Sequence, residues 1–208
     1  MNVLLLGGSP SAPSTTWRLQ QLVGARLAAL GHSTLSLQVL QVRDLPAQAL
    51  LRADTSDPAI AEAVALLRDA DAVVVGTPVY KASFSGVLKT FLDLLPQDGL
   101  AGKLVLPLAT GGSQSHMLAL DYALRPVLAS LAPRHILPSI YATSEQLPWD
   151  ADKGLAPVAA IAARIDAGVE QLAHELEQLR QREPLRKAAE PPGVPAAAPA
   201  PAPAPVAA

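Results

Sequence analysis

The sequence AVVVGTPVYKASFSGVLKTFLD, residues 72–93, joins a fully apolar run to an amphipathic helical pattern through a single turn. The apolar run predicts a strand that is buried on both faces, as in a parallel sheet. Thr77 and Pro78 are expected to end that strand, and Val79 and Tyr80 then offer backbone donors and a flat apolar wall. A turn between a buried parallel strand and the next helix is a typical ligand-binding position. The stretch therefore predicts an α/β fold with a ligand loop at this turn.

The same alternation of apolar runs and helical patterns extends through the chain. Strands are predicted at five short apolar runs, residues 3–6, 34–40, 72–76, 103–109 and 136–142. Helices are predicted where apolar residues recur every three or four positions, at residues 16–30, 58–69, 84–95, 115–131 and 157–182. Such alternation gives right-handed crossovers and a doubly wound parallel sheet with helices on both faces.

Composition limits the possible classes of function. The chain has 208 residues, half of them hydrophobic, which predicts one domain, residues 1–183. A formal net charge of −2 provides no basic field for a phosphodiester backbone, so no nucleic acid partner is expected. The absence of cysteine excludes thiolate nucleophiles, disulfides and cysteine-ligated metals, and it fits a reducing cytoplasm. The N-terminal MNVLLLGGSP lacks the features of a signal peptide and is too short to span a bilayer, so no membrane partner is expected.

The composition changes near the C-terminus. Beyond Glu183 the chain is mostly Pro and Ala, as in PAPAPAP at residues 199–205. Such a segment cannot support a hydrophobic core and favours extended, polyproline-like conformations. Residues 184–208 are therefore expected to form a disordered tail, either a docking segment or a spacer without a function of its own.

Three loops rich in Gly, Ser and Thr follow the first, third and fourth predicted strands, at residues 7–16, 76–86 and 110–116. In a five-stranded sheet of order 2-1-3-4-5 these strands are neighbours. All three loops then meet at the carboxyl edge, next to the point where the strand order reverses. A different strand order would separate them.

The first loop, GGSPSAPSTTW at residues 7–17, is neither a Walker loop nor a GxGxxG fingerprint. Its hydroxyls suit a phosphate monoester, because the start of the next helix adds free amides and the positive end of its dipole. The candidate phosphate ligands are Ser9, Ser11, Ser14, Thr15 and Thr16. The alternative is a helix cap within a Ser/Pro-rich turn.

The three loops together resemble those of the NADPH-dependent FMN reductase family, within the flavodoxin-like superfamily. They are most similar to the FMN reductase component of two-component alkanesulfonate monooxygenase systems. The resemblance covers about residues 1–180 and implies a flavodoxin-like, five-stranded parallel sheet of order 2-1-3-4-5. It also implies FMN and NADPH as cofactors, hydride transfer from NADPH to FMN without a catalytic side chain, and delivery of reduced FMN to a partner monooxygenase for sulfur acquisition from sulfonates.

The resemblance also assigns site residues. It places residues 77–80 around the flavin ring and assigns the pyrimidine edge to the third loop, through Thr110, Gly111, Gly112 and Ser113. His116 is either a helix-entrance residue or a contact to the flavin or nicotinamide. It has no partners at metal-ligand spacing, so no metal site is expected.

Charged residues around the loops have more than one interpretation. Family members often carry an Arg where this chain has Ser11, so one cationic phosphate contact is missing, and Arg18 is the expected substitute. Lys89 and Asp93 are spaced i, i+4 and are expected to form a helical charge pair rather than a catalytic one.

The predicted helix at residues 115–131 is irregular because Pro126 removes one amide donor and crowds the carbonyl of Tyr122. The placement of Tyr122 resembles the π-helix of two-component flavin reductases, where an inserted residue lies at the tetramer interface. We therefore expect a π-helix here and a homo-oligomer, either a dimer or a tetramer.

Two other functions fit the same residues. One is a tightly FMN-bound NAD(P)H-dependent reductase of quinones, azo dyes or metal oxyanions. The other is a non-catalytic, flavodoxin-like electron carrier, although only 3% of the residues are aromatic and the net acidity is mild. The sequence does not distinguish a preference for NADPH from one for NADH.

Overall fold

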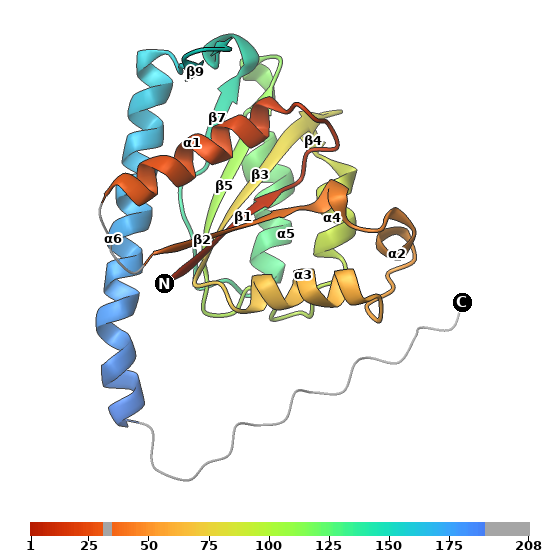
Figure 1. Ribbon diagram of the computed structural model, residues 1–208, viewed down its shortest axis with the longest axis vertical. Coiled ribbons are helices and arrows are strands. Elements are labelled where there is room, and N and C mark those ends of the chain that lie inside the picture. Colours follow the sequence, from red (N-terminus) through yellow and green to blue (C-terminus); the bar gives the residue numbers. More distant parts are fainter. Residues whose placement is uncertain (31–34, 190–208) are drawn as a thin grey trace.

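A single mixed sheet forms the centre of the molecule (Figure 1). The structure is a computed structural model that describes residues 1–30 and 35–189. The strands of this sheet are β1 (Asn2–Gly7), β2 (Ser36–Gln41), β3 (Ala72–Tyr80), β4 (Ser83–Phe84), β5 (Leu104–Gly111), β6 (His135–Ile136) and β7 (Ile140–Thr143). Parallel pairing gives the order β2-β1-β3-β5-β6, while β7 also pairs with β5 and β4 adds an antiparallel hairpin to β3. This order confirms the predicted flavodoxin-like sheet.

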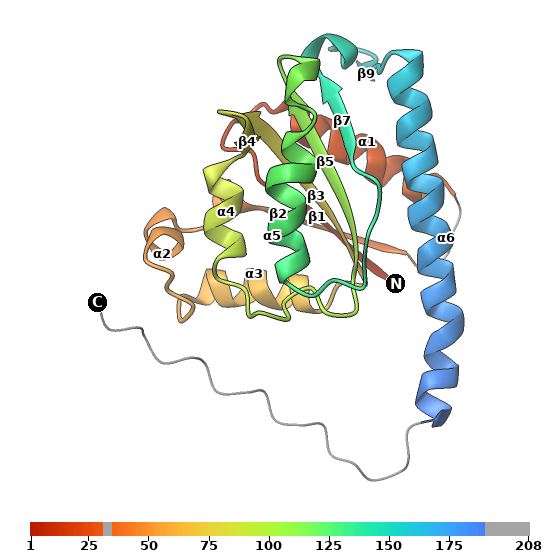
Figure 2. The same ribbon diagram turned by 180° about the vertical axis from the view of Figure 1, so that it is seen from behind.

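Helices cover both faces of the sheet, as the two opposite views show (Figures 1 and 2). They are α1 (Thr15–Ala29), α2 (Ala47–Leu51), α3 (Pro58–Arg68), α4 (Gly86–Leu92), α5 (Arg125–Ser130) and α6 (Ala159–Ala189). Helices α1 and α6 enclose one hydrophobic core, and the other helices enclose a second. Because alternate strand residues enter the two cores, such as Leu4 and Leu5, the strands are apolar throughout.

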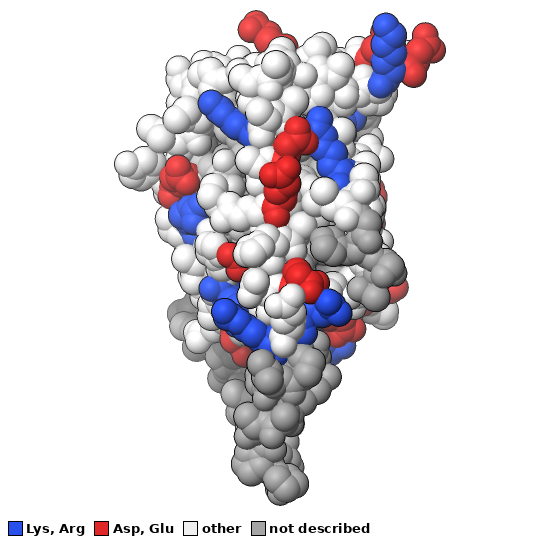
Figure 3. Space-filling view, turned by 90° about the vertical axis from the view of Figure 1, so that its left-hand side faces the viewer, with Lys and Arg blue, Asp and Glu red and all other residues white. Residues whose placement is uncertain are grey.

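Short elements connect these layers. They are the 3₁₀ turns η1 (Val42–Asp44), η2 (Gln114–His116) and η4 (Ser144–Gln146), the π-helix η3 (Leu120–Leu124), and the hairpin strands β8 (Trp149–Asp150) and β9 (Gly154–Leu155). No helix in the described ranges is both long and apolar enough to cross a membrane. On the face that carries α6, acidic and basic side chains are interspersed (Figure 3).

Strand β3 does not end at Thr77 and Pro78, as the sequence predicted, but continues to Tyr80. It then turns through Lys81 and Ala82, with φ of 50° and 60°, into β4. Strand β1 ends opposite Gly76, whereas β5 continues to pair as far as Pro78. A proline is tolerated there because the sheet has narrowed to one neighbour.

Two other boundaries differ from the predictions. The fifth strand is divided into β6 and β7, because Pro138 between them has no amide to donate. Helix α6 continues to Ala189, so residues 184–189, predicted to belong to the tail, are helical. The remainder of that predicted tail, residues 190–208, and the predicted start of the second strand at residue 34 lie outside the described residues.

The predicted irregularity before Pro126 is present. Residues 120–124 form the π-helix η3, in which the Arg125 amide donates to the Leu120 carbonyl, and α5 follows with Pro126 in its first turn. Tyr122 lies on this π-helix and is 80% exposed. The predicted charge pair between Lys89 and Asp93 is also present, at 2.5 Å.

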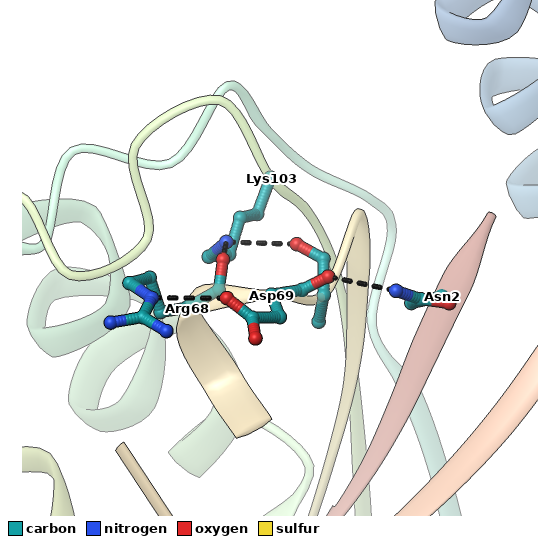
Figure 4. A network of polar contacts seen from close by, with 5 residues as sticks. Asn2, Arg68, Asp69 and Lys103 are labelled. Carbon is teal, nitrogen blue, oxygen red and sulfur yellow. Dashed lines mark hydrogen bonds and ion pairs between the residues drawn. The ribbon is translucent and has the colours of Figure 1, made fainter. Parts of the chain in front are cut away.

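Lys103 closes the amino edge of the sheet, opposite the three loops. Its Nζ donates to the carbonyls of Arg68 at 2.6 Å and Ala70 at 2.8 Å, just where α3 ends (Figure 4). The residue is only 8% exposed, and burial lowers the pKa of its amine below 10.5. A buried cation at a helix C-terminus satisfies carbonyls that otherwise have no donor.

We predict that Lys103→Met lowers the free energy of unfolding by about 2–3 kcal/mol, because two buried carbonyls lose a charged donor. Urea unfolding measures the change. The matched control is Lys153→Met in the exposed β8–β9 turn, which should alter stability by less than about 0.5 kcal/mol. Equal unfolding midpoints for wild type and Lys103→Met would contradict the assignment.

The same lysine predicts a pH dependence. Because the folded protein releases the Lys103 proton at a lower pH than the unfolded chain, the unfolded chain binds more protons between the two pKa values. The contribution of Lys103 to the free energy of unfolding therefore rises with pH through this interval below 10.5. Unfolding of wild type and Lys103→Met from neutral pH to about pH 10 should show a growing difference. If the difference in the free energy of unfolding became smaller as the pH rises, the prediction would be contradicted.

Candidate functional site

The three predicted loops meet at the carboxyl edge of the sheet. The Gly8 amide donates to the Gly76 carbonyl at 2.7 Å, and the Ser85 hydroxyl donates to the Gly8 carbonyl. The hydroxyls of Thr16 and Thr110 are 2.6 Å apart and buried. These contacts join the first loop to each of the other two, so the predicted convergence is confirmed.

Gln20, which the sequence did not single out, fixes the point where the strand order reverses. It is fully buried, and its Nε2 donates to the carbonyls of Leu6 at 2.9 Å and Val74 at 3.0 Å. A Cβ added to Gly76 would lie 2.2 Å from Gln20 Cδ. Because Gly76 has no side chain, the Gln20 side chain fits against it and bridges β1 and β3.

A cavity of about 270 Å³ lies among the loops. Its lining comes from all three loops and from η4: Ser9, Ser11, Pro13, Ser14, Thr15, Thr16, Pro78, Val79, Tyr80, Thr110, Gly111, Gly112 and Ser144. Pro13 and Ser144 were not predicted. Ser144 begins η4 directly after β7, and only the sheet order brings it beside the first loop.

Three predicted residues do not line this cavity. Thr77 is buried beneath it, where its Oγ1 accepts from the Ser85 amide and donates to the Pro78 carbonyl, both at 2.9 Å. Ser113 caps η2 through its side chain, and its carbonyl accepts from the Tyr141 hydroxyl at 2.5 Å. His116 is half-buried, and its Nδ1 has no hydrogen-bond partner within the described part of the chain.

Hydrogen bonding prepares the first loop for an anion. Ser9 Oγ accepts from the Ser11 amide and Ser14 Oγ from the Trp17 amide, each at 3.3 Å. Neither hydroxyl proton has an acceptor within the described residues, so both can donate to a ligand. The amides of Thr15 and Thr16 at the start of α1 have no acceptor among the described residues. Hydroxyls and helix-terminal amides are a donor set that fits a phosphate.

Two arginines lie close to the first loop. Arg18, the expected substitute for the missing cationic contact, does not line the cavity. Its guanidinium stacks instead on Trp149, 3.8 Å from the ring centroid, because the β8–β9 hairpin covers this side of α1. Arg43, which was not predicted, does not line the cavity either, but its Nη1 donates to the carbonyl of Ser11, which does.

The third loop is supported from behind by Tyr141. A Cβ on Gly111 would lie 2.3 Å from the Tyr141 hydroxyl, whereas one on Gly112 would meet no atom within 4 Å. Burial raises the pKa of Tyr141, which keeps its hydroxyl protonated as a donor to Ser113. Gly111 thus allows close packing, and Gly112 leaves its backbone open to a ligand.

In the described part of the chain, the cavity lining contains no Asp, Glu, His, Lys or Arg. The residues present can donate hydrogen bonds, exclude water and hold a flat apolar group against Pro78, Val79 and Tyr80. Such a lining suits a reaction whose bond chemistry belongs to bound cofactors.

The sequence pattern of the NADPH-dependent FMN reductase family matches residues 1–147, which include all three loops. The chain belongs to the NADPH-dependent FMN reductase family. It is therefore an oxidoreductase with FMN and NADPH as cofactors, as the sequence predicted.

Individual relatives agree with the family assignment. The chain is 47% identical over 149 residues to the FMN reductase (NADPH) of Pseudomonas putida strain KT2440, covering 72% of this chain and 74% of that one. It is 34% identical over 174 residues to the NADH-dependent FMN reductase SfnE of Pseudomonas putida, covering 82% and 90%. A crystal structure of the NADH:FMN oxidoreductase EMOB superposes with a TM-score of 0.76 at 41% identity, covering 84% of this chain and 89% of that one.

We predict that Gly76→Ala lowers the free energy of unfolding by about 2–3 kcal/mol, because the new Cβ displaces Gln20 from its buried position. The matched control is Gly86→Ala at the start of α4, where a Cβ meets nothing within 4 Å. That variant should keep its stability or gain up to about 1 kcal/mol, because alanine restricts the unfolded chain more than glycine does. Thermal or urea unfolding compares the two, and equal losses would contradict the role of Gly76.

Proposed function

We propose that this FMN reductase oxidises NADPH, reduces FMN and passes reduced FMN to a partner monooxygenase in the cytoplasm, for sulfur acquisition from sulfonates. The observation that carries the proposal is the uncharged cavity formed by three loops, whose lining combines hydroxyl-bearing residues of the first loop with the apolar Pro78 and Val79 and the ring of Tyr80. The redox chemistry is hydride transfer between the bound cofactors. The protein's part is to align them.

Each loop has a proposed role in binding FMN. Ser9, Ser11, Ser14, Thr15 and Thr16 hold the phosphate, while Pro78, Val79 and Tyr80 contact the ring. Thr110, Gly111 and Gly112 surround the pyrimidine edge, whereas Ser113 and His116 of the same loop lie outside the cavity lining. Thr77 acts from below by fixing the carbonyl of Pro78 and the start of α4.

We further propose that FMN is a diffusible substrate rather than a permanently bound group. In the described part of the chain the cavity lining has no Lys or Arg to pair with the phosphate, which favours weak binding. Part of the flavin would remain accessible to NADPH, and the reduced flavin could leave. NADH is the alternative hydride donor for the same site, since the names of the relatives include both NADPH and NADH.

We predict that the purified protein oxidises NADPH in the presence of free FMN. The loss of NADPH absorbance should be followed with FMN, FAD and riboflavin in turn, and rates should saturate with FMN. No oxidation with any flavin would contradict the proposed reaction. A permanently yellow protein that turns over free FMN poorly would favour a tightly flavin-bound reductase instead.

We also propose that the π-helix lies at a contact between subunits of a homodimer or homotetramer. Tyr122 is exposed together with Met117 and Leu118, which leaves three large apolar side chains uncovered along one segment. Clustered apolar exposure of this kind is typical of an interface.

Tyr122→Ala should therefore produce a smaller species than wild type by light scattering after gel filtration. The matched control is Leu51→Ala, which truncates another highly exposed apolar side chain on α2. It should leave the mass unchanged. An unchanged mass for Tyr122→Ala would remove the support for this interface.

A further inference from the structure

The first loop, which supplies the proposed phosphate ligands, brings no positive charge to the cavity lining in the described part of the chain. The whole lining consists of hydroxyl, apolar and glycine residues, with no Lys or Arg among the described residues. A phosphate monoester carries about −1.5 to −2 charges at pH 7. Neutral donors can bind its oxygens, but they leave most of this charge uncompensated.

Arg43 lies directly beside the same loop. The register of β1 with β2 places Gly7 opposite Gln41, so the turn η1, which follows β2, lies next to the residues that follow Gly7. From η1 the Arg43 guanidinium reaches the carbonyl of Ser11, a residue of the cavity lining. Among the described residues, it is the one Lys or Arg side chain that bonds to this loop.

The guanidinium of Arg43 has N–H donors without an acceptor among the described residues. Its Nη1 is used by Ser11, and its Nε lies 3.6 Å from Asp44 Oδ1. The Arg43 side chain is 19% exposed and that of Asp44 is 70% exposed, so solvent screens this ion pair. An arginine has five N–H donors, and Nη2 has no acceptor among the described residues.

The contact with Arg43 also determines the orientation of the Ser11 carbonyl. A carbonyl oxygen facing a phosphate would repel it, and the contact with Arg43 holds the Ser11 carbonyl on the Arg43 side of the loop. Arg18, the other arginine near the start of α1, stacks on Trp149 and has no hydrogen bond to this loop among the described residues. Arg43 is thus the better-placed cation.

We propose that Arg43 is a positioning residue for the FMN phosphate, which it favours by its charge and by fixing the Ser11 carbonyl. The inference rests on the proposed binding of FMN in this cavity. Under this proposal, Arg43 affects the binding of FMN through the phosphate and not through the ring.

The test compares FMN with riboflavin, which has the same ring and no phosphate. Dissociation constants for both are measured by flavin fluorescence titration of wild type and Arg43→Gln. The variant should weaken FMN binding by about ten- to a hundredfold, as expected for loss of a charged partner, and riboflavin binding by less than about twofold. Arg43→Lys, which keeps the charge, should recover part of the FMN affinity. The matched control Arg18→Gln should leave the FMN-to-riboflavin ratio unchanged.

The other outcomes overturn the proposal. Equal weakening of FMN and riboflavin would show that Arg43 only maintains the loop, and unchanged affinities would show that it has no role. A loss of FMN preference in Arg18→Gln instead of Arg43→Gln would assign the charge to Arg18. Failure of the proposed function would be distinguishable, since wild type would then prefer FMN to riboflavin without oxidising NADPH.

Discussion

The site depends on how closely the backbone segments approach one another where β1 and β3 separate. The Gly8 amide bonds directly to the Gly76 carbonyl, and a Cβ on Gly8 would lie 2.6 Å from Leu88 Cβ. Gln20 fills the space that Gly76 leaves open and donates to both strands. With the strands held this way, the start of α1 and the end of β3 face the same cavity, and Thr16 reaches Thr110 on β5. The position of each loop follows from this close approach.

Local patterns predicted much of this arrangement. Apolar strands separated by helical patterns gave the sheet, and the Gly, Ser and Thr of three loops identified most of the cavity lining. Gln20 and Arg43 could not be recognised in this way, because each acts on a segment that lies far away in the sequence or on a neighbouring strand. The continuation of β3 was missed because Thr-Pro usually ends a strand, whereas here β5 pairs with β3 as far as Pro78 and β4 pairs with Val79 and Tyr80.

Under the proposed function, the lining of the cavity would align two nucleotide cofactors without acid–base residues. Its hydroxyls are oriented by backbone donors, so they are prepared before a ligand arrives. Its apolar wall is carried by a strand that is anchored on β5, and Tyr141 fixes the third loop from behind. Preorganisation of this kind contributes to rate by alignment rather than by proton transfer.

In the described part of the chain, the first-loop residues that line the cavity carry no titratable side chain, which has a consequence for regulation under the proposed function. The Ser, Thr and Pro residues of the first loop that line the cavity neither gain nor lose protons under physiological conditions. Acidification within a cell would therefore act on the ligand and not on its receptor, through the second ionisation of the phosphate near pH 6. Above about pH 6, the fraction of sites occupied by FMN would therefore depend on the concentration of flavin and hardly on pH.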